Sequence, residues 1–238
     1  MVRLRPFMPR FEFRRPLGLT IGILFAFVIL PRVHGYVPWR ISPWPKGTVI
    51  TVQLELGLPP TPLQDGSQNW NVAIAPAIDA WNAEMHDVQL ASVMNSTKPV
   101  SSGDKVNSAS FADSVFGDAF GNGVLAVTYY TYQSSTFLEA DMLLIRLRLL
   151  TPIAAIFSSI PRASASAISN AFSLHELGHA LGLNHPDSAG QHVDAIMNSV
   201  VSNRSTLAAD DEAGIQFLYG LPNSSPARQP LLPAPLRR

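Results

Sequence analysis

The sequence predicts an α+β fold, because it contains both strand-like runs and apolar residues repeated at helical spacing. The strand-like runs are rich in β-branched and aromatic residues, and the helical segments place apolar residues three or four positions apart. The strand-like runs are 48–54, 123–131 and 138–147, and the helical segments lie near 70–81, 168–181 and 207–220. With 238 residues, 47% of them hydrophobic, the chain is long enough for one medium-sized domain with a proper core.

The first predicted strand, 48–54, follows a turn. Residues 44–47 read Trp-Pro-Lys-Gly, a combination that favours a turn just before a β-branched run. In the helical segment that comes next, we expect the apolar side chains to pack on a sheet rather than to bind a cofactor. Pro76 lies inside this segment and should kink the helix or shift its start. The apolar residues at helical spacing are Trp70, Ile74, Ile78 and Trp81.

Two later strand-like runs are predicted to pair with each other. Residues 123–131 and 138–147 are separated by the short polar segment 133–136, so we expect them to form an antiparallel pair. Between residues 95 and 122 the composition turns to Ser, Gly, Asp and Asn. This region is predicted to be rich in loops, and we assign it no element.

Residues 1–35 are predicted to be a secretory signal peptide. Arginines precede an apolar run of about 14 residues, Leu17 to Leu30, and small side chains stand at Val33 and Gly35. We expect cleavage after Gly35. The alternative is an uncleaved anchor, the one segment through which the chain would contact a membrane, but the apolar run is short for a span of roughly 20 residues.

Charge and cysteine content exclude several kinds of protein. The sequence has no cysteine, so neither a disulfide nor a thiolate metal site can form. Without residues 1–35 it keeps 11 basic and 16 acidic side chains, a formal charge of −5, which argues against nucleic acid as a partner. Residues 221–238 are rich in proline, lack a helical or strand period, and are predicted to be a flexible tail.

The run 175–185 carries the most specific chemistry in the sequence. In an α-helix, residues four apart lie on one face, so His175 and His179 can direct both imidazoles at a single metal ion. Glu176 follows His175, where its carboxylate can flank the same point without being a ligand. That arrangement suits a general base acting on a metal-bound water.

A catalytic zinc ion usually has three protein ligands, and His185 can be the third only if the helix stops before it. Gly182 can adopt the left-handed conformation that ends a helix, and Pro186 prevents the helix from resuming. We therefore expect the chain to turn at Gly182 and bring His185 back toward His175 and His179.

The run 175–185 resembles the long zinc signature HExxHxxGxxH of the metzincin metalloproteases, position for position. Met197, twelve residues after His185, is similar to the methionine of the metzincin Met-turn. The resemblance implies that Met197 lies beneath the three histidines as an apolar floor and does not bind the metal. Ser199 stands where astacins and serralysins have a tyrosine, so those branches are disfavoured.

Residues 207–220 resemble the C-terminal helix of matrixins, a metzincin branch. The likeness includes the pair Asp210 and Asp211, which it implies are structural and tie the Met-turn region to this helix. It also implies that residues 36–220 form a minimal secreted catalytic domain. Such a domain has a twisted mixed β-sheet with an antiparallel edge strand, packed on long helices that include the zinc-binding helix.

The same resemblance bears on the metal content. Animal matrixins carry extra histidines near the edge strand for a structural zinc, but no histidine lies between His86 and His175, so we expect one catalytic zinc ion. Calcium is a further candidate, although scattered carboxylates near loops are more often solvated or capping groups. The candidate calcium ligands are Asp113, Asp118, Glu139 and Asp141.

These features predict a secreted, extracellular, monomeric zinc endopeptidase that acts on proteins or peptides. By the resemblance, residues 124–130 form the edge at which an extended substrate adds its own strand. Ser199, Val200 and Val201 are expected to form the wall of a pocket that favours an apolar side chain just after the cut bond.

Two alternatives remain open at this point. The chain could be an interaction module that binds zinc on a metzincin scaffold without turnover, although the intact Glu176 speaks against this. The third ligand could instead be a downstream carboxylate such as Glu212, which the spacing of His185 disfavours. His86 and His192 are interpreted as ordinary surface or loop histidines.

Overall fold

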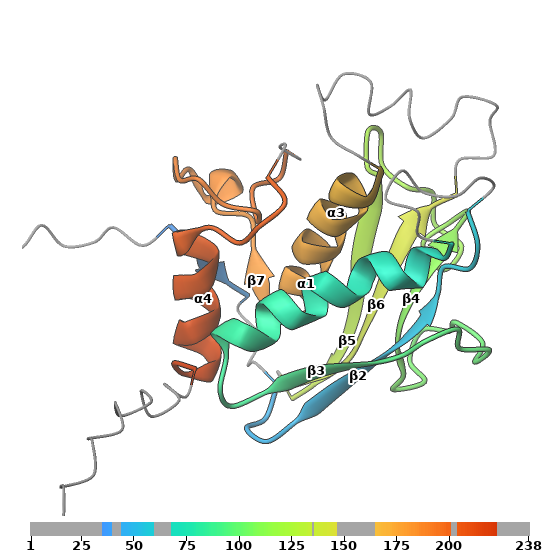
Figure 1. The fold of residues 1–238 in the computed structure, drawn as a ribbon, viewed down its shortest axis with the longest axis horizontal. Helices are drawn as coiled ribbons and strands as arrows, with labels where there is room; N and C mark the ends of the chain where they lie inside the picture. Colours follow the sequence, from blue (N-terminus) through green and yellow to red (C-terminus); the bar gives the residue numbers. More distant parts are fainter. Residues whose placement is uncertain are drawn as a thin grey trace, which may run out of the picture. The chain divides into compact units, whose positions relative to one another are not determined.

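The computed structural model describes residues 35–39, 44–59, 68–134, 136–146, 165–200 and 204–222. Within these ranges the chain forms short and long strands, three α-helices and one 3-10 helix (Figure 1). In chain order they are β1 (Val37–Pro38), β2 (Val49–Glu55), α1 (Trp70–Glu84), β3 (Gln89–Val93), β4 (Asn107–Ala112), β5 (Ala126–Gln133), β6 (Thr136–Ile145), α3 (Ala165–Ala180), β7 (Leu183–Asn184), η2 (Asp187–Ala189) and α4 (Ala209–Tyr219).

The main sheet has five strands in the order β3-β2-β4-β6-β5. Strand β2 pairs in parallel with β3 and with β4, and β4 pairs in parallel with β6. Strand β5 pairs with β6 antiparallel and has no neighbour on its other side within the sheet. The predicted α+β architecture, a mixed sheet with an antiparallel edge strand, is therefore present.

The sequence pattern correctly predicted three of the strands. The predicted first strand is β2, and it follows a turn in which the Thr48 amide donates to Pro45 O at 3.1 Å. The predicted antiparallel pair is β5 and β6, with a tighter hairpin than expected because Gln133 already pairs with Thr136. Strand β5 begins at Ala126 rather than at Gly123.

The loop assignment for residues 95–122 was incomplete, because this region contains strand β4. Half of its residues are polar, and their side chains add hydrogen bonds to the backbone pairing with its neighbours. Asn107 Nδ2 donates to Thr51 O at 3.2 Å on β2, and Asn107 Oδ1 accepts from the Ala140 amide at 3.0 Å on β6. Ser108 Oγ, also buried, donates to Asp141 Oδ1 at 2.5 Å.

Helix α1 begins at Trp70 and continues through Pro76, so this proline does not shift its start, and the alternative expectation of a kink stays a prediction. Asn69 precedes the helix in an extended conformation, and its side chain accepts from the Asn71 amide at 2.8 Å, which caps the first turn. The four apolar residues predicted to face the sheet are buried: Trp70, Ile74, Ile78 and Trp81.

Helices α1 and α3 pack against each other and against the sheet, and their contact forms the core (Figure 1). Trp81 of α1 is fully buried, and its indole Nε1 donates to Leu174 O of α3 at 2.9 Å. Leu174 and Leu177 of α3 are also buried. Because the predicted metal-binding face belongs to α3, this core fixes the position of that face.

Several sequence predictions fall outside the described residues. They include the signal segment up to residue 34, the tail from residue 223 onward, and Val201 of the expected pocket wall. In the described part of the chain, no helix combines the length and apolarity required to cross a bilayer.

Helix α4 is connected to the segment around Met197 by the buried carboxylate of Asp211. This carboxylate accepts from the amides of Ile196 at 2.8 Å, Met197 at 3.2 Å and Ala208 at 2.8 Å. The neighbouring Asp210 accepts from the Gly35 amide at 2.6 Å. Asp211 thus makes the predicted connection to the Met-turn region, whereas Asp210 holds the chain ahead of β1.

We expect Asp211→Asn to lower the free energy of unfolding by about 2–4 kcal/mol, because an amide cannot accept the same set of backbone N–H bonds as a carboxylate. Urea unfolding of the full chain measures the change. Glu212→Gln is the matched control, since it removes a charge from the same first turn of α4. Equal losses in the two variants would show that only the helix dipole is involved.

Candidate metal centre and catalytic cleft

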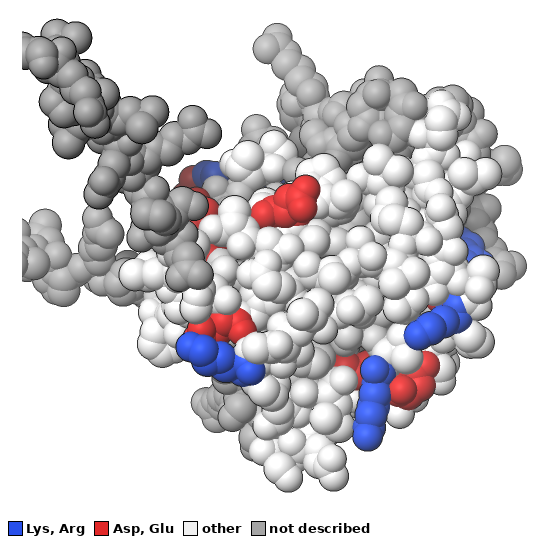
Figure 2. All heavy atoms as spheres, turned by 60° about the horizontal axis from the view of Figure 1, so that its bottom comes forward, with Lys and Arg blue, Asp and Glu red and all other residues white. Residues whose placement is uncertain are grey.

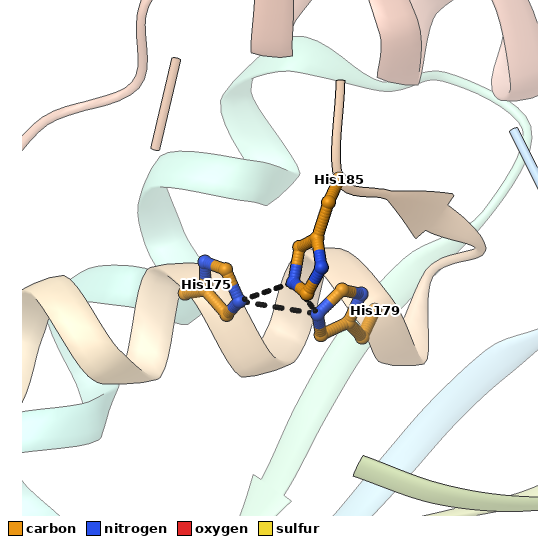
Figure 3. Close-up of side chains that lie close together, drawn as sticks. All are labelled: His175, His179 and His185. Atoms are coloured by element: carbon orange, nitrogen blue, oxygen red, sulfur yellow. Dashed lines mark hydrogen bonds between the residues drawn. The ribbon is translucent and has the colours of Figure 1, made fainter. Parts of the chain in front are cut away.

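The three histidines of the run 175–185 converge on one point (Figure 3). The Nε2 atoms lie 3.1 Å apart for His175 and His179, 3.1 Å for His175 and His185, and 3.0 Å for His179 and His185. His175 and His179 come from α3, and His185 comes from the segment just after β7. His175 is buried, and the other two are half-buried.

The approach of His185 depends on the way α3 ends. The helix stops at Ala180, and Gly182 adopts a left-handed φ of 100°, as the sequence predicted. The last carbonyl groups of a helix lack hydrogen-bond donors within the helix. Here two buried side chains donate to them. Trp44 Nε1 donates to Ala180 O at 2.8 Å, and the Tyr219 hydroxyl donates to Leu181 O at 2.6 Å.

Backbone carbonyls fix the tautomer of two of the imidazoles. His175 Nδ1 lies 2.8 Å from Ile196 O, and His179 Nδ1 lies 2.8 Å from Leu183 O. A carbonyl oxygen only accepts hydrogen bonds, so both Nδ1 atoms carry the hydrogen and both Nε2 atoms present a lone pair to the shared point. These lone pairs are the ones that bind metals.

Burial also keeps the three imidazoles neutral. It lowers the pKa of His175, and it lowers the pKa of His179 to about 3, with a further contribution from the neighbouring His175. For His185, burial and then His175 lower the pKa. Neutral imidazole is the form that coordinates a metal ion.

The arrangement of the three Nε2 atoms fits a small cation with tetrahedral coordination. Zinc binds imidazole nitrogens at about 2.0–2.1 Å, which places neighbouring ligand nitrogens about 3.3 Å apart in a tetrahedral site. The observed separations of 3.0–3.1 Å require only a small opening of the three rings. Three imidazoles leave a fourth position free, as in catalytic rather than structural zinc sites.

Glu176 lies beside the histidines with its carboxylate buried. The Thr128 hydroxyl on β5 donates to Glu176 Oε2 at 2.7 Å and lies 3.0 Å from the Glu176 carbonyl oxygen. Burial raises the pKa of Glu176 to about 7, against the opposing effect of the Thr128 hydrogen bond. A carboxyl group in this range can both take up and release a proton near neutral pH.

A cavity of about 690 Å³ lies over these groups. Strand β5 and the residues before it form one side of it, from Gly123 to Thr128, and Ser199 and Val200 contribute on another. The predicted substrate edge and two of the three predicted wall residues therefore line one cavity with the metal centre. The metal-centre residues that line it are His175, Glu176, His179 and His185.

Met197, the predicted methionine floor, packs against the helix that carries His175 and His179. Met197 is buried, and a methyl group built on Gly178 would overlap its sulfur atom. Gly178 lies between His175 and His179 in α3, so the methionine packs on the turn of helix that carries them. A polarizable, flexible side chain suits such a close contact.

The candidate calcium ligands do not gather in the same way. In the described part of the chain, His175, His179 and His185 are the one group of three or more ligating side chains that converge. Both oxygens of Glu139 accept from backbone amides, those of Gly103 at 2.7 Å and Lys105 at 2.6 Å. Glu139 therefore holds the loop before β4. Glu212, the alternative third zinc ligand, is not part of the converging group.

Sequence reasoning missed two supporting contacts. Asp187 accepts from the Ser199 amide at 2.9 Å and from the Ser199 hydroxyl at 2.6 Å, which ties the segment after His185 to the segment after Met197. The other is the contact of Thr128 with Glu176. A threonine on the strand face that it shares with Ala126 and Tyr130 was the signal available for it, because buried hydroxyls require partners.

Comparisons with known proteins identify a family for most of the chain. The family model described as matrixin, a peptidase family, matches residues 66–220. A solved structure described as the GM1-bound form of the ECX AB5 holotoxin is similar to 81% of this chain and 92% of its own, with 14% identity and a TM-score of 0.47. A likeness at that level supports no inference. The match over residues 66–220 covers well over half of the sequence, and the chain belongs to the matrixin family.

Proposed function

We propose that this chain is a secreted, zinc-dependent endopeptidase. The observation that carries the proposal is the gathering of three neutral imidazoles and one buried carboxylate on the floor of a single cavity. The matrixin match supports a metalloprotease scaffold. The apolar segment ahead of Gly35 supports secretion.

In this proposal His175, His179 and His185 hold the ion through Nε2. When bound, zinc supplies a Lewis acid that polarises a carbonyl group and lowers the pKa of water toward about 7. The hydrogen bonds from Nδ1 of His175 and His179 to carbonyl oxygens keep these two rings in the orientation that binding requires.

Glu176 acts as the general base and then as the general acid. Its carboxylate takes a proton from the attacking water and returns it to the nitrogen of the departing amine, so the peptide C–N bond breaks with no net proton uptake by the enzyme. Its buried position supports this role, because a carboxylate with a raised pKa accepts a proton more readily than an ordinary carboxylate and can still release it near neutral pH.

The peptide lies along β5. This strand is the edge of the sheet and lines the cavity, so an extended peptide can add a further strand there through its backbone. Such binding depends more on the backbone of the peptide than on its side chains. Ser199 and Val200 then form part of the wall of a pocket for the residue just after the cut bond.

The surface charge is compatible with a protein substrate. On the face drawn in Figure 2, acidic and basic side chains of the described residues lie in small groups separated by uncharged surface. Nucleic-acid-binding surfaces instead concentrate lysine and arginine on one face. We therefore propose proteins or peptides as the substrate; the monomeric state stays a prediction.

Glu176→Ala should reduce kcat on an unstructured protein such as casein by about 10²–10⁴-fold, because the proton acceptor is lost. The zinc content should stay at one ion per chain, since Glu176 is not a ligand. Glu212→Ala is the control and should keep both activity and zinc. Unchanged digestion by Glu176→Ala would rule out the proposed base.

His185→Ala should weaken zinc binding by about 100-fold or more, because only two imidazoles remain at the centre. Competition with a metallochromic chelator measures the affinity. His192→Ala, the same change at an exposed histidine nearby, should leave the affinity unchanged. Equal zinc affinity in the His185 variant and the parent would mean that the third ligand lies elsewhere.

A peptide library should be cut preferentially before apolar residues. Val200→Asp should lower kcat/KM for the preferred peptides by about tenfold, since a carboxylate in the pocket wall disfavours an apolar side chain. Mass spectrometry of the products gives the cleavage sites. A cleavage profile without an apolar preference would remove the pocket assignment and leave the metal centre untouched.

A further inference from the structure

We infer that Thr128 is a positioning residue for Glu176, holding the carboxylate of the proposed base from the strand along which the peptide lies. The inference rests on the proposed function, in which Glu176 transfers the proton. It adds a residue that neither the zinc signature nor the Met-turn contains.

The contact joins two elements that are far apart in the sequence. Thr128 lies on β5, opposite Met142 of β6, and only 9% of its surface is exposed. Glu176 lies on α3 and is 5% exposed. The hydroxyl of Thr128 is 2.7 Å from Glu176 Oε2, so the carboxylate is held from the sheet as well as from its own helix.

A buried carboxylate needs a donor, because burying a charge without one is costly. The hydrogen bond from Thr128 to Oε2 is a charge-assisted bond of normal length. It restrains the rotation of the Glu176 side chain, which has three rotatable bonds. The other oxygen of the carboxylate is then free to face the cavity that Glu176 and Thr128 both line.

The Thr128 hydroxyl can keep its hydrogen bond to Glu176 before and after the proton transfer. The hydroxyl has one hydrogen and two Glu176 oxygens within reach, Oε2 at 2.7 Å and the carbonyl oxygen at 3.0 Å. When the carboxylate is charged, the hydrogen points to Oε2. The proton is taken up by the other oxygen, which faces the cavity, so the hydrogen bond from the Thr128 hydroxyl to Oε2 stays in place when Glu176 is protonated. No other group has to move.

The position on β5 links this contact to substrate binding. Thr128 belongs to the edge strand that lines the cavity, between Val127 and Tyr129. A peptide that pairs with this strand is therefore aligned with the same backbone that holds the base. Removing the hydroxyl should affect the catalytic step rather than the binding of the peptide.

The first test is kinetic and uses the full chain loaded with zinc. Thr128→Val keeps the branched shape without the hydroxyl, and we expect kcat to fall about 10–100-fold with KM within about twofold. Thr128→Ser restores the hydroxyl and should recover kcat to within about threefold of the parent. Thr51→Val is the matched control, the same change at a half-buried threonine of β2, a strand that does not line this cavity, and should leave kcat unchanged.

The second test does not depend on activity. In the zinc-free chain, Thr128→Val should lower Tm more in the parent than in a Glu176→Ala background, because only the parent then has a buried carboxylate without its donor. Equal Tm changes in both backgrounds would mean that the hydroxyl supports the strand or the helix carbonyl alone, and would overturn the inference.

The two tests separate the inference from the function on which it rests. If the parent cuts peptides and Glu176→Ala does not, while Thr128→Val keeps the parent kcat, the role of Thr128 is wrong and the proposed function stands. If the parent cuts no peptide but the Tm changes depend on Glu176, the proposed function fails and the contact between the two residues is still supported.

Discussion

The candidate site depends on where helix α3 stops. Two histidines four positions apart come from the helix itself, but the third can join them only if the chain reverses within the next few residues. The left-handed φ of Gly182 makes the reversal possible, and three hydrogen-bond donors make it stable. They are the Trp44 indole, the Tyr219 hydroxyl and the Trp39 amide, which satisfy the carbonyl oxygens of Ala180, Leu181 and Gly182. These groups come from both ends of the domain, so the local turn is a product of the whole fold.

The histidines are likewise supported by hydrogen bonds from distant parts of the chain. Ile196 accepts from the Nδ1 of His175 through its carbonyl, and its amide donates to Asp211. A single residue thus connects helix α4 to an imidazole of the metal centre. Helix α4 contributes no residue to the lining of the cavity, yet through Asp211 and Ile196 it supports one of the histidines. Hydrogen bonds behind the ligands fix the orientation of the rings as firmly as the ligands fix the ion.

Much of the fold and of the candidate site could be predicted from the sequence, because the relevant signals are local. The periodicity of α1, the β-branched run of β2 and the spacing from His175 to His185 each depend on neighbouring residues. Strand β4 could not be predicted in the same way, since its polar side chains are satisfied by β2 and β6, which lie far away in the sequence. The two-residue strands β1 and β7 exist only through their mutual pairing. The contact of Thr128 with Glu176 likewise required the packing of α3 on β5.

The central claim is that His175, His179 and His185 bind one zinc ion together. X-ray absorption at the zinc edge, on the full chain loaded with one equivalent of zinc, tests it most directly. We expect three imidazole nitrogens at about 2.0–2.1 Å with one further oxygen or nitrogen ligand. A spectrum with two imidazoles or fewer, and the remaining ligands from carboxylates, would contradict it.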